Sequence, residues 1–381
     1  MKKILIISET PTHPTNAGNR NAILSQSQIL KELGCDVYFL YVQNEFENKN
    51  DFIATQEYWK DHFFFFKKNI LYKWKKLITN KYRKVFFHWT WKCDDSYVPF
   101  LSKYVNQLNK KINFDICIIN YYNLTKLFLQ IEIAKKAIFT HDSFSYKNLV
   151  IGRNVEGSID ASNEAKALQR CPYIFALQDN EAIFFQRLSP KSKVYTVYSN
   201  FTFKELPLQN ENINNILFLS GPNQYNINGI TWFLEEVFPI INQQYPNTKL
   251  LIGGGICNYI KKDNINSNIV LQGQVKNIED FYSQGNIVIN PVYEGTGIKI
   301  KTLEALSFGK CIITRTHSTE GLYDKNSAPI LYSDNPIQWV QFIEQILKGE
   351  VSLIDIKEKA HIYIDKMHNY IYKQYKDFIE D

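Results

Sequence analysis

The segment NPVYEGTGIKIKTLEALSFGKCIIT, residues 290–314, gathers residue types that can hold a phosphate group. Gly295 and Gly297 permit backbone conformations closed to other residues and let the chain approach a ligand closely. A helix is predicted to begin near Lys299, and the free N–H groups at its start form a ready anion site. Lys299 and Lys301 would add formal positive charge at the same place.

Glu304 follows about one turn into that helix, between Leu303 and Leu306, which we expect to face the core. A carboxylate at this depth can accept hydrogen bonds from a sugar diol, as acidic residues do from ribose in dinucleotide-binding folds. Together these residues suit a nucleoside diphosphate with its ribose attached. The alternative is an ordinary strand-to-helix turn, in which Lys301 and Glu304 form a surface pair contributing roughly 0.3 kcal/mol.

Length and composition indicate a globular protein of two domains. The chain has 381 residues, of which 45% are hydrophobic and 22% charged, and domains of roughly 150 to 200 residues are usual. No apolar run approaches the roughly 18 residues needed to span a bilayer. The N-terminal MKKILIISETPTHPTN reads as a buried first strand rather than a signal peptide, so a cytoplasmic protein is expected.

The cysteines are scattered without Cys-x-x-Cys spacing, which favours buried thiols over disulfides or zinc. No metal ligands are therefore predicted. The six cysteines are Cys35, Cys93, Cys117, Cys171, Cys257 and Cys311.

Strand-like runs alternate with helix-length segments almost from end to end, which is the βαβ pattern of parallel, doubly wound sheets. Periodicity is lost near 203–214, where a linker is predicted, and from Asn335 onward the pattern predicts helix. We therefore expect an α/β protein with a Rossmann-like domain at 1–205, a second at 206–355, and a final helix at 356–381 that packs back on the first domain. Ligands should bind at the carboxyl ends of the strands, in the cleft between the domains.

GTGIKIKTLEALSFGKCIIT followed by STEGL resembles the donor-binding segment of family-4 glycosyltransferases, the group 1 glycosyl transferases with the GT-B fold. GPNQYNINGITWFLEEVFPII, QGQVKNIEDFYSQGNIVINPV, PYIFALQDNEAIFF and ISETPTHPTNAGNRNAI resemble other parts of the same family. The resemblance covers most of the chain outside residues 46–100. It implies two Rossmann-like domains facing a central cleft, and transfer of a sugar from a nucleotide-diphosphate sugar with retention of configuration. It also implies that no metal or other cofactor is needed.

The family's donor motif is Glu, seven residues, Glu. Its second glutamate matches Glu304, which the resemblance implies binds the ribose hydroxyls. Its first glutamate falls on Thr296, because Glu294 is two positions too early. At this point, either the residue that takes the role of the first glutamate in contacting the donor sugar is not identified, or Thr296 and the Gly297 backbone make this contact.

The family's Arg/Lys pair, which follows the first strand of the C-terminal domain, is missing from SGPNQYNING. The resemblance implies that Gly221 of this loop belongs to the donor-binding site. It makes Lys299 and Lys301 the candidates to neutralise the leaving diphosphate, since some cation must stabilise its developing charge. Glu320 in STEGL either borders the donor pocket or caps the next helix.

In the N-terminal half, AIFTHDSF places His141 at the carboxyl end of a strand, facing the expected cleft. The resemblance implies that His141 contacts the donor sugar or the reacting centre, whereas a histidine at a strand end is otherwise more often structural. Gly18 of NAGNRN matches a family glycine that lets the first loop approach the donor phosphate and the acceptor.

Positive charge is concentrated between Lys60 and Lys92, where ten Lys or Arg and one Asp give +9 and leave −3 for the rest of the chain. Aromatic residues alternate with these cations. The segment, part of a basic and aromatic insert at about 46–100, could rest on anionic lipid headgroups. The alternative is a helix whose aromatics pack into the domain while its lysines face water. Nucleic acid is not expected, because no recognised binding module surrounds the segment.

The combined prediction is a retaining glycosyltransferase that passes a sugar to a glycan or lipid-linked acceptor in the assembly of cell-surface polysaccharide or glycoconjugate. It would act in the cytoplasm or at the inner face of the membrane. Two alternatives stay open: a nucleotide-sugar epimerase of the same fold, and a catalytically silent partner subunit of a glycosyltransferase. A dehydrogenase is disfavoured, because neither domain begins with G-x-G-x-x-G after its first strand.

Overall fold

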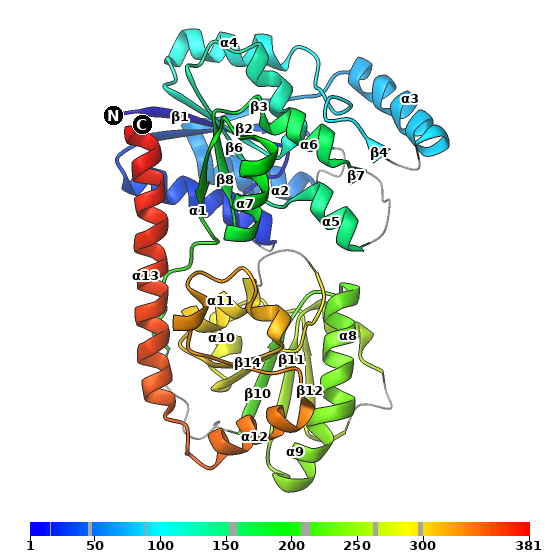
Figure 1. Cartoon of the computed structure of the whole chain (residues 1–381), viewed down its shortest axis with the longest axis vertical. Coiled ribbons are helices and arrows are strands. Elements are labelled where there is room, and N and C mark those ends of the chain that lie inside the picture. The colour runs from blue at the N-terminus through cyan, green and yellow to red at the C-terminus, as the bar shows by residue number, and fades with distance from the viewer. Residues whose placement is uncertain are drawn as a thin grey trace. The chain divides into compact units, whose positions relative to one another are not determined.

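The computed structural model describes residues 1–15, 17–44, 48–87, 90–151, 158–206, 214–261, 266–295 and 300–381. The chain forms two α/β units (Figure 1). Unit 1 comprises Met1–Asn200 and Tyr370–Asp381, and unit 2 comprises Phe201–Asn369.

Unit 1 is built on a seven-stranded parallel sheet in the order β3-β2-β1-β5-β6-β8-β9. Its central strands are buried on both faces, as the unbroken apolar run ILII of β1 requires. The strands are β1 (Lys3–Ser8), β2 (Asp36–Val42), β3 (Phe63–Phe66), β5 (Ile116–Asn120), β6 (Lys135–Phe139), β8 (Tyr173–Ala176) and β9 (Lys193–Thr196), and β4 (Thr90–Trp91) pairs with β7 (Ser158–Ile159).

The helices of unit 1 connect these strands in the βαβ manner. They are α1 (Gly18–Glu32), α2 (Lys49–Trp59), α3 (Ile70–Phe86), α4 (Leu101–Ile112), α5 (Phe144–Ile151), α6 (Ala161–Leu168) and α7 (Asp179–Leu188). Figure 1 shows α3 at the periphery of the unit, away from the sheet.

The prediction of an insert at about 46–100 is wrong for part of this range. Phe63–Phe66 is the edge strand of the main sheet, parallel to β2, with Tyr41 opposite Phe65. All four phenylalanines of β3 are partly buried, since an edge strand is covered less completely than a central one. A run of four identical aromatic residues has no alternation, so periodicity could not identify it as a strand.

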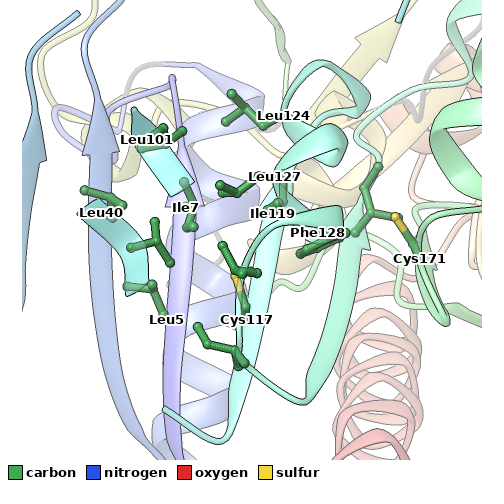
Figure 2. Packing of buried hydrophobic residues seen from close by; sticks show 14 of the residues in the cluster. Leu5, Ile7, Leu40, Leu101, Cys117, Ile119, Leu124, Leu127, Phe128 and Cys171 are labelled. Atoms are coloured by element: carbon green, nitrogen blue, oxygen red, sulfur yellow. The ribbon is translucent and has the colours of Figure 1, made fainter. Parts of the chain in front are cut away.

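The core of unit 1 includes two of the cysteines. Figure 2 shows Cys117 and Cys171 among leucine, isoleucine and phenylalanine side chains. Burial raises the pKa of the Cys117 thiol well above its ordinary value. All six cysteines are free thiols, and all except the partly buried Cys257 are buried, which confirms the prediction for five of them.

The last residues of the chain complete the core of unit 1. Helix α13 (Leu353–Glu380) begins in unit 2 and ends in unit 1. Phe378 packs edge-on against Tyr173, Phe175 and Tyr195, with ring centroids 4.9–6.0 Å apart. The Tyr375 hydroxyl accepts a hydrogen bond of 3.2 Å from the Gln26 amide.

Unit 2 has a six-stranded parallel sheet in the order β12-β11-β10-β13-β14-β15. In both units the order of the strands reverses at the first strand, between β1 and β5 and between β10 and β13, and doubly wound sheets bind ligands at such a switch point. The strands are β10 (Asn215–Leu219), β11 (Lys249–Gly253), β12 (Ile269–Gly273), β13 (Ile287–Asn290), β14 (Cys311–Thr314) and β15 (Ile330–Tyr332).

The helices of unit 2 follow its strands. They are α8 (Gln224–Trp232), α9 (Phe238–Gln244), α10 (Ile278–Tyr282), α11 (Ile300–Ser307) and α12 (Pro336–Leu347). The prediction of helix from Asn335 to the end is corrected, because α12 stops at Leu347. Gly349 follows with φ 74°, the left-handed conformation that ends helices and that glycine adopts without strain.

Within the described ranges, none of the helices has the length and apolar character that crossing a bilayer requires. The same residues contain no cluster of three or more His, Cys, Asp or Glu side chains that could hold a metal ion.

Candidate functional site

The predicted phosphate-binding turn follows β13 in unit 2. Gly295 has φ 106°, a conformation that favours glycine. Its carbonyl oxygen lies 2.6 Å from Nε2 of His317, and because a carbonyl only accepts, Nε2 carries the proton. Thr296, Gly297 and Lys299 lie outside the described residues, so their predicted roles stay predictions.

Contacts with the loop after β14 hold this turn in place. The Ser318 hydroxyl donates to the Val292 carbonyl at 2.6 Å, and the Asn290 amide donates to the Thr302 hydroxyl at 3.1 Å. Helix α8 packs closely against the other side of the segment after β13. A Cβ atom at Gly229 would lie only 2.9 Å from the carbonyl oxygen of Pro291. These contacts hold the described residues on either side of the turn.

Glu304 lies in α11, one turn from its start. Its Oε1 accepts a 2.8 Å hydrogen bond from the hydroxyl of Tyr282, whose ring stacks on Phe308 with centroids 4.6 Å apart. Burial raises the pKa of Glu304, while the Tyr282 hydroxyl and the charges of Lys301 and Lys204 lower it. Among the residues the structure describes, no donor is bonded to Oε2, which leaves an acceptor for a ligand hydroxyl.

Lys301 connects α11 to the loop after β10. Its ammonium group donates to the side-chain oxygen of Asn226, and the Asn226 amide donates to the Gly221 carbonyl at 2.9 Å. Gly221 is exposed, and a Cβ built on it meets no atom within 4 Å. The sequence-predicted residues Lys301 and Gly221 thus belong to one hydrogen-bonded network.

Glu320 contacts the turn through His317. Its carboxylate lies 3.2 Å from Nδ1 of His317, and its side chain is 58% exposed. Nε2 of the same ring bonds to Gly295. Glu320 follows the short 3-10 segment Thr316–Thr319, and no described helix begins directly after it, so it caps none. His317 was missed by sequence reasoning, because only the fold brings it to the turn.

Arg315, also missed, stands at the carboxyl end of β14. Its guanidinium lies 4.3 Å from the ring centroid of Trp232 and 5.1 Å from that of Tyr293. It also pairs with Asp334 at 2.7 Å. These contacts brace Tyr293, and with it the turn, against α8.

In unit 1, His141 follows β6 with φ 65°, a backbone conformation uncommon for residues other than glycine. Its Nε2 lies 2.7 Å from Oδ1 of Asn120, whose amide nitrogen donates to the Ile7 carbonyl at 3.3 Å. The asparagine oxygen therefore accepts, and Nε2 of His141 carries the proton. Burial lowers the pKa of His141 to about 3, so the ring is neutral and its Nδ1 is a hydrogen-bond acceptor.

Tyr121 positions the histidine ring. It follows β5 with φ 68°, and its ring stacks on His141 with centroids 4.3 Å apart and planes 18° apart. Asn19, in the first turn of α1, donates to the Tyr121 hydroxyl at 2.9 Å. Gly18 is the first residue of this helix. The predicted residues Gly18 and His141 thus lie on neighbouring elements linked by Asn19 and Tyr121.

Buried carboxylates anchor the chain after His141. Glu164 accepts hydrogen bonds from the backbone of Phe144 at 3.0 Å and of Ser145 at 2.9 Å, which caps the start of α5. Glu181 accepts from the Leu177 N–H at 3.3 Å. Burial, with the nearby Asp142 charge, raises the pKa of Glu181 to about 7.

Solved structures share this fold over the whole chain. A variant of S. aureus TarM in complex with Fondaparinux, alpha-GlcNAc-glycerol and UDP is 11% identical, with 100% of each chain covered and a TM-score of 0.68. Anabaena HepE in complex with UDP is 13% identical, with 100% of each chain covered and a TM-score of 0.66. Sucrose-phosphate synthase from Thermosynechococcus elongatus is 13% identical, covered over 100% of this chain and 98% of that chain, with a TM-score of 0.69.

The fold is that of the GT-B glycosyltransferases, as these neighbours establish. The chain is also 22% identical to an "Uncharacterized 44.6 kDa protein in cps region" of Klebsiella pneumoniae, over 97% of either protein. Residues 213–349 match the family model described as "Glycosyl transferases group 1".

Proposed function

We propose that the protein transfers a sugar from a nucleoside-diphosphate sugar to a hydroxyl group of a glycan or lipid-linked acceptor, with retention of configuration and without a metal. The match of residues 213–349 to the group 1 glycosyl transferases supports glycosyl transfer as the coarse activity. UDP is bound in the solved structures of HepE and TarM. The relative in a cps region supports a place in polysaccharide or glycoconjugate assembly.

The observation that carries the proposal is the pair of groups presented by α11. Glu304 offers a carboxylate oxygen held by Tyr282, and Lys301 offers an ammonium held by a neutral amide. Both residues follow, along the chain, a turn in which Gly295 permits the backbone to approach a ligand closely. A ribose diol bound to the carboxylate would bring the attached diphosphate toward the ammonium and the helix N-terminus.

In the proposed reaction, the bond between the anomeric carbon and the diphosphate oxygen breaks, and its electron pair leaves with the diphosphate. The acceptor hydroxyl oxygen bonds to the same carbon from the same face, and its proton passes to the departing phosphate oxygen. Lys301, with Lys299, stabilises the charge that develops there. His141 accepts a hydrogen bond from a sugar hydroxyl at its unprotonated Nδ1, which orients the donor.

We further propose that the enzyme works at the inner face of the membrane, where a lipid-linked acceptor is presented. A basic segment with +9 net charge in unit 1 supports this location. The proposal for the sugar transfer itself does not depend on it.

The test is thermal shift with a panel of nucleoside diphosphates, together with detection of slow donor hydrolysis. One diphosphate should stabilise the protein. Glu304→Gln should weaken its binding about tenfold or more, because a hydrogen bond to a charged group contributes about 1.5–3 kcal/mol. Glu236→Ala, which removes an exposed carboxylate of the same unit, is the control and should change nothing.

Intact binding in Glu304→Gln would remove the ribose role from that residue. Stabilisation by no nucleotide would instead identify a catalytically silent subunit. A sugar nucleotide converted to its epimer without an acceptor would identify an epimerase.

A further inference from the structure

Helix α3 of unit 1 exposes a face of large apolar side chains. Trp74 is 61% exposed, Leu77 65% and Ile78 68%. Five further apolar residues of the helix are at least half exposed: Ile70, Leu71, Tyr82, Val85 and Phe86. Single exposed apolar residues are normal on proteins, but a contiguous apolar patch marks an interaction site.

The spacing of these residues places them on one side of the helix. Leu71, Trp74, Ile78, Tyr82 and Val85 follow one another at three- or four-residue steps, which is the repeat of a helical face. We call the eight exposed residues the apolar face of α3.

The opposite side of α3 fastens the helix to unit 1. Its buried residues are Tyr72 and Arg83. Tyr72 joins the main core of the unit, and Arg83 pairs with Asp95 at 2.8 Å. The helix is thus anchored by an aromatic ring and an ion pair while its apolar face points to solvent. This reverses the usual arrangement of a surface helix.

Lysines border the apolar face. The sequence of α3 contains Lys73, Lys75, Lys76, Lys81 and Lys84 and no acidic residue. Interfacial helices combine an apolar face carrying Trp and Leu with lysines on the flanks, which are attracted to anionic lipid headgroups. Two copies of this face would bring like charges together, which opposes self-association.

A cavity of about 420 Å³ adjoins the helix. Its lining includes Lys73, Lys76 and Leu77 of α3, together with Lys68, which lies just before the helix and is buried and paired with Glu9. Leu77 is shared by the cavity and the apolar face. An anionic group at the level of the apolar face would therefore meet Lys73 and Lys76.

We propose that α3 lies in the interface of an anionic lipid bilayer, with its apolar face at the boundary of the acyl chains and its lysines, including Lys73 and Lys76 of the cavity, on lipid phosphates. This deepens the proposed function, because it names the element that brings the enzyme to a lipid-linked acceptor. Vesicle binding and nucleotide binding are measured separately, so either proposal can fail alone.

The experiment is flotation of the full chain with vesicles of phosphatidylcholine alone or with about one third phosphatidylglycerol. The wild type should float with the anionic vesicles only, and less so as salt is raised. Trp74→Ser with Ile78→Ser should lower binding by about tenfold or more, because two large apolar side chains would no longer be buried at the boundary of the acyl chains. Lys73→Gln with Lys81→Gln should lower binding and flatten its salt dependence.

Matched controls separate this site from apolar exposure in general. Ile337 and Ile354 in unit 2 are 61% and 67% exposed, so Ile337→Ser with Ile354→Ser removes comparable apolar surface elsewhere and should leave flotation unchanged. The α3 variants should keep the wild-type thermal shift with nucleoside diphosphate.

Three results would overturn the inference. One is a wild type that does not float with anionic vesicles, and another is an α3 variant that floats as the wild type does. The third is self-association by light scattering that the α3 variants abolish, which would make the face an interface between copies. Flotation without any nucleotide-induced shift would leave this inference standing and remove the proposed function.

Discussion

The two units place their candidate groups at equivalent positions of similar sheets but obtain the local backbone differently. In unit 1, Tyr121 and His141 adopt left-handed conformations, with φ 68° and 65°. Each costs of order 1 kcal/mol or more. In unit 2, the turn uses Gly295, at φ 106°, without that cost. Unit 1 therefore accepts strain to place the Tyr121 and His141 side chains, whereas the turn of unit 2 obtains its left-handed conformation from a glycine.

The charge states of the candidate groups also differ between the two units. Burial keeps the ring of His141 neutral, with a pKa of about 3. In unit 2, burial also raises the pKa of Glu304, but Lys301 and Lys204 work against the rise. The first site thus offers an uncharged acceptor, and the second a carboxylate balanced by ammonium groups.

The largest expected effect concerns the strained histidine. His141→Ala should lower kcat about 100-fold, within the range for a positioned catalytic group, while the dissociation constant of the nucleoside diphosphate stays unchanged. His141→Asn is the matched control, since asparagine tolerates the left-handed conformation. It should restore the melting temperature without restoring turnover. Full turnover in the asparagine variant would mean that turnover depends on the backbone conformation at this position and not on the imidazole ring.

The protonation of a buried carboxyl group in unit 1, that of Glu181, can be tested by varying the pH. The pKa of Glu181 is raised from 4.5 to about 7, so the folded protein holds this proton more tightly than the unfolded chain. The associated stability is fully present below pH 4.5 and is lost as the pH rises through 7. The loss corresponds to about 3 kcal/mol.

Glu181→Gln cannot titrate and should lack this loss. Urea unfolding of both proteins at a series of pH values measures the difference, to which all other groups contribute equally. A difference independent of pH would contradict the assignment.

In unit 2, Lys301→Ala should weaken nucleoside diphosphate binding about tenfold but leave binding of the corresponding nucleoside unchanged. Calorimetric titration of both ligands measures the ratio. Lys276→Ala, an exposed lysine of the same unit, should keep the wild-type ratio. Equal losses for both ligands would show that Lys301 supports the fold and not the diphosphate.

The smallest expected effect is the difference between alanine substitutions at two glycines of unit 2, Gly221 and Gly229. Gly221→Ala should leave the melting temperature unchanged, because a Cβ there meets no atom within 4 Å, while binding of the diphosphate weakens a few-fold if the ligand passes close by. Gly229→Ala should lower the melting temperature, since its Cβ would lie 2.9 Å from a backbone oxygen. Unchanged diphosphate binding in Gly221→Ala would remove that glycine from the donor pocket.

Sequence patterns predicted the fold class and the placement of several site residues. The apolar strands and their intervening helices predicted two doubly wound units, because burial on both faces leaves continuous apolar runs. The spacing from Gly295 to Glu304 placed a carboxylate one turn into a helix, where the structure has it. The parts of the site built from one segment were thus accessible to sequence reasoning.

Contacts between distant segments were not accessible. Tyr282 meets Glu304 and His317 meets Gly295 only because β13 and β14 are neighbours in the sheet. The exposed face of α3 was also missed in its detail, since the sequence pattern shows an amphipathic helix but not which side faces the core. Composition alone suggested that its aromatics were either buried or at a membrane.

Helix α13 carries the chain back from unit 2 to unit 1, where Tyr375 and Phe378 cover β8 and β9. These residues are synthesised after the whole of unit 2. The apolar surface of β8 and β9 in unit 1 therefore stays uncovered until unit 2 has been translated.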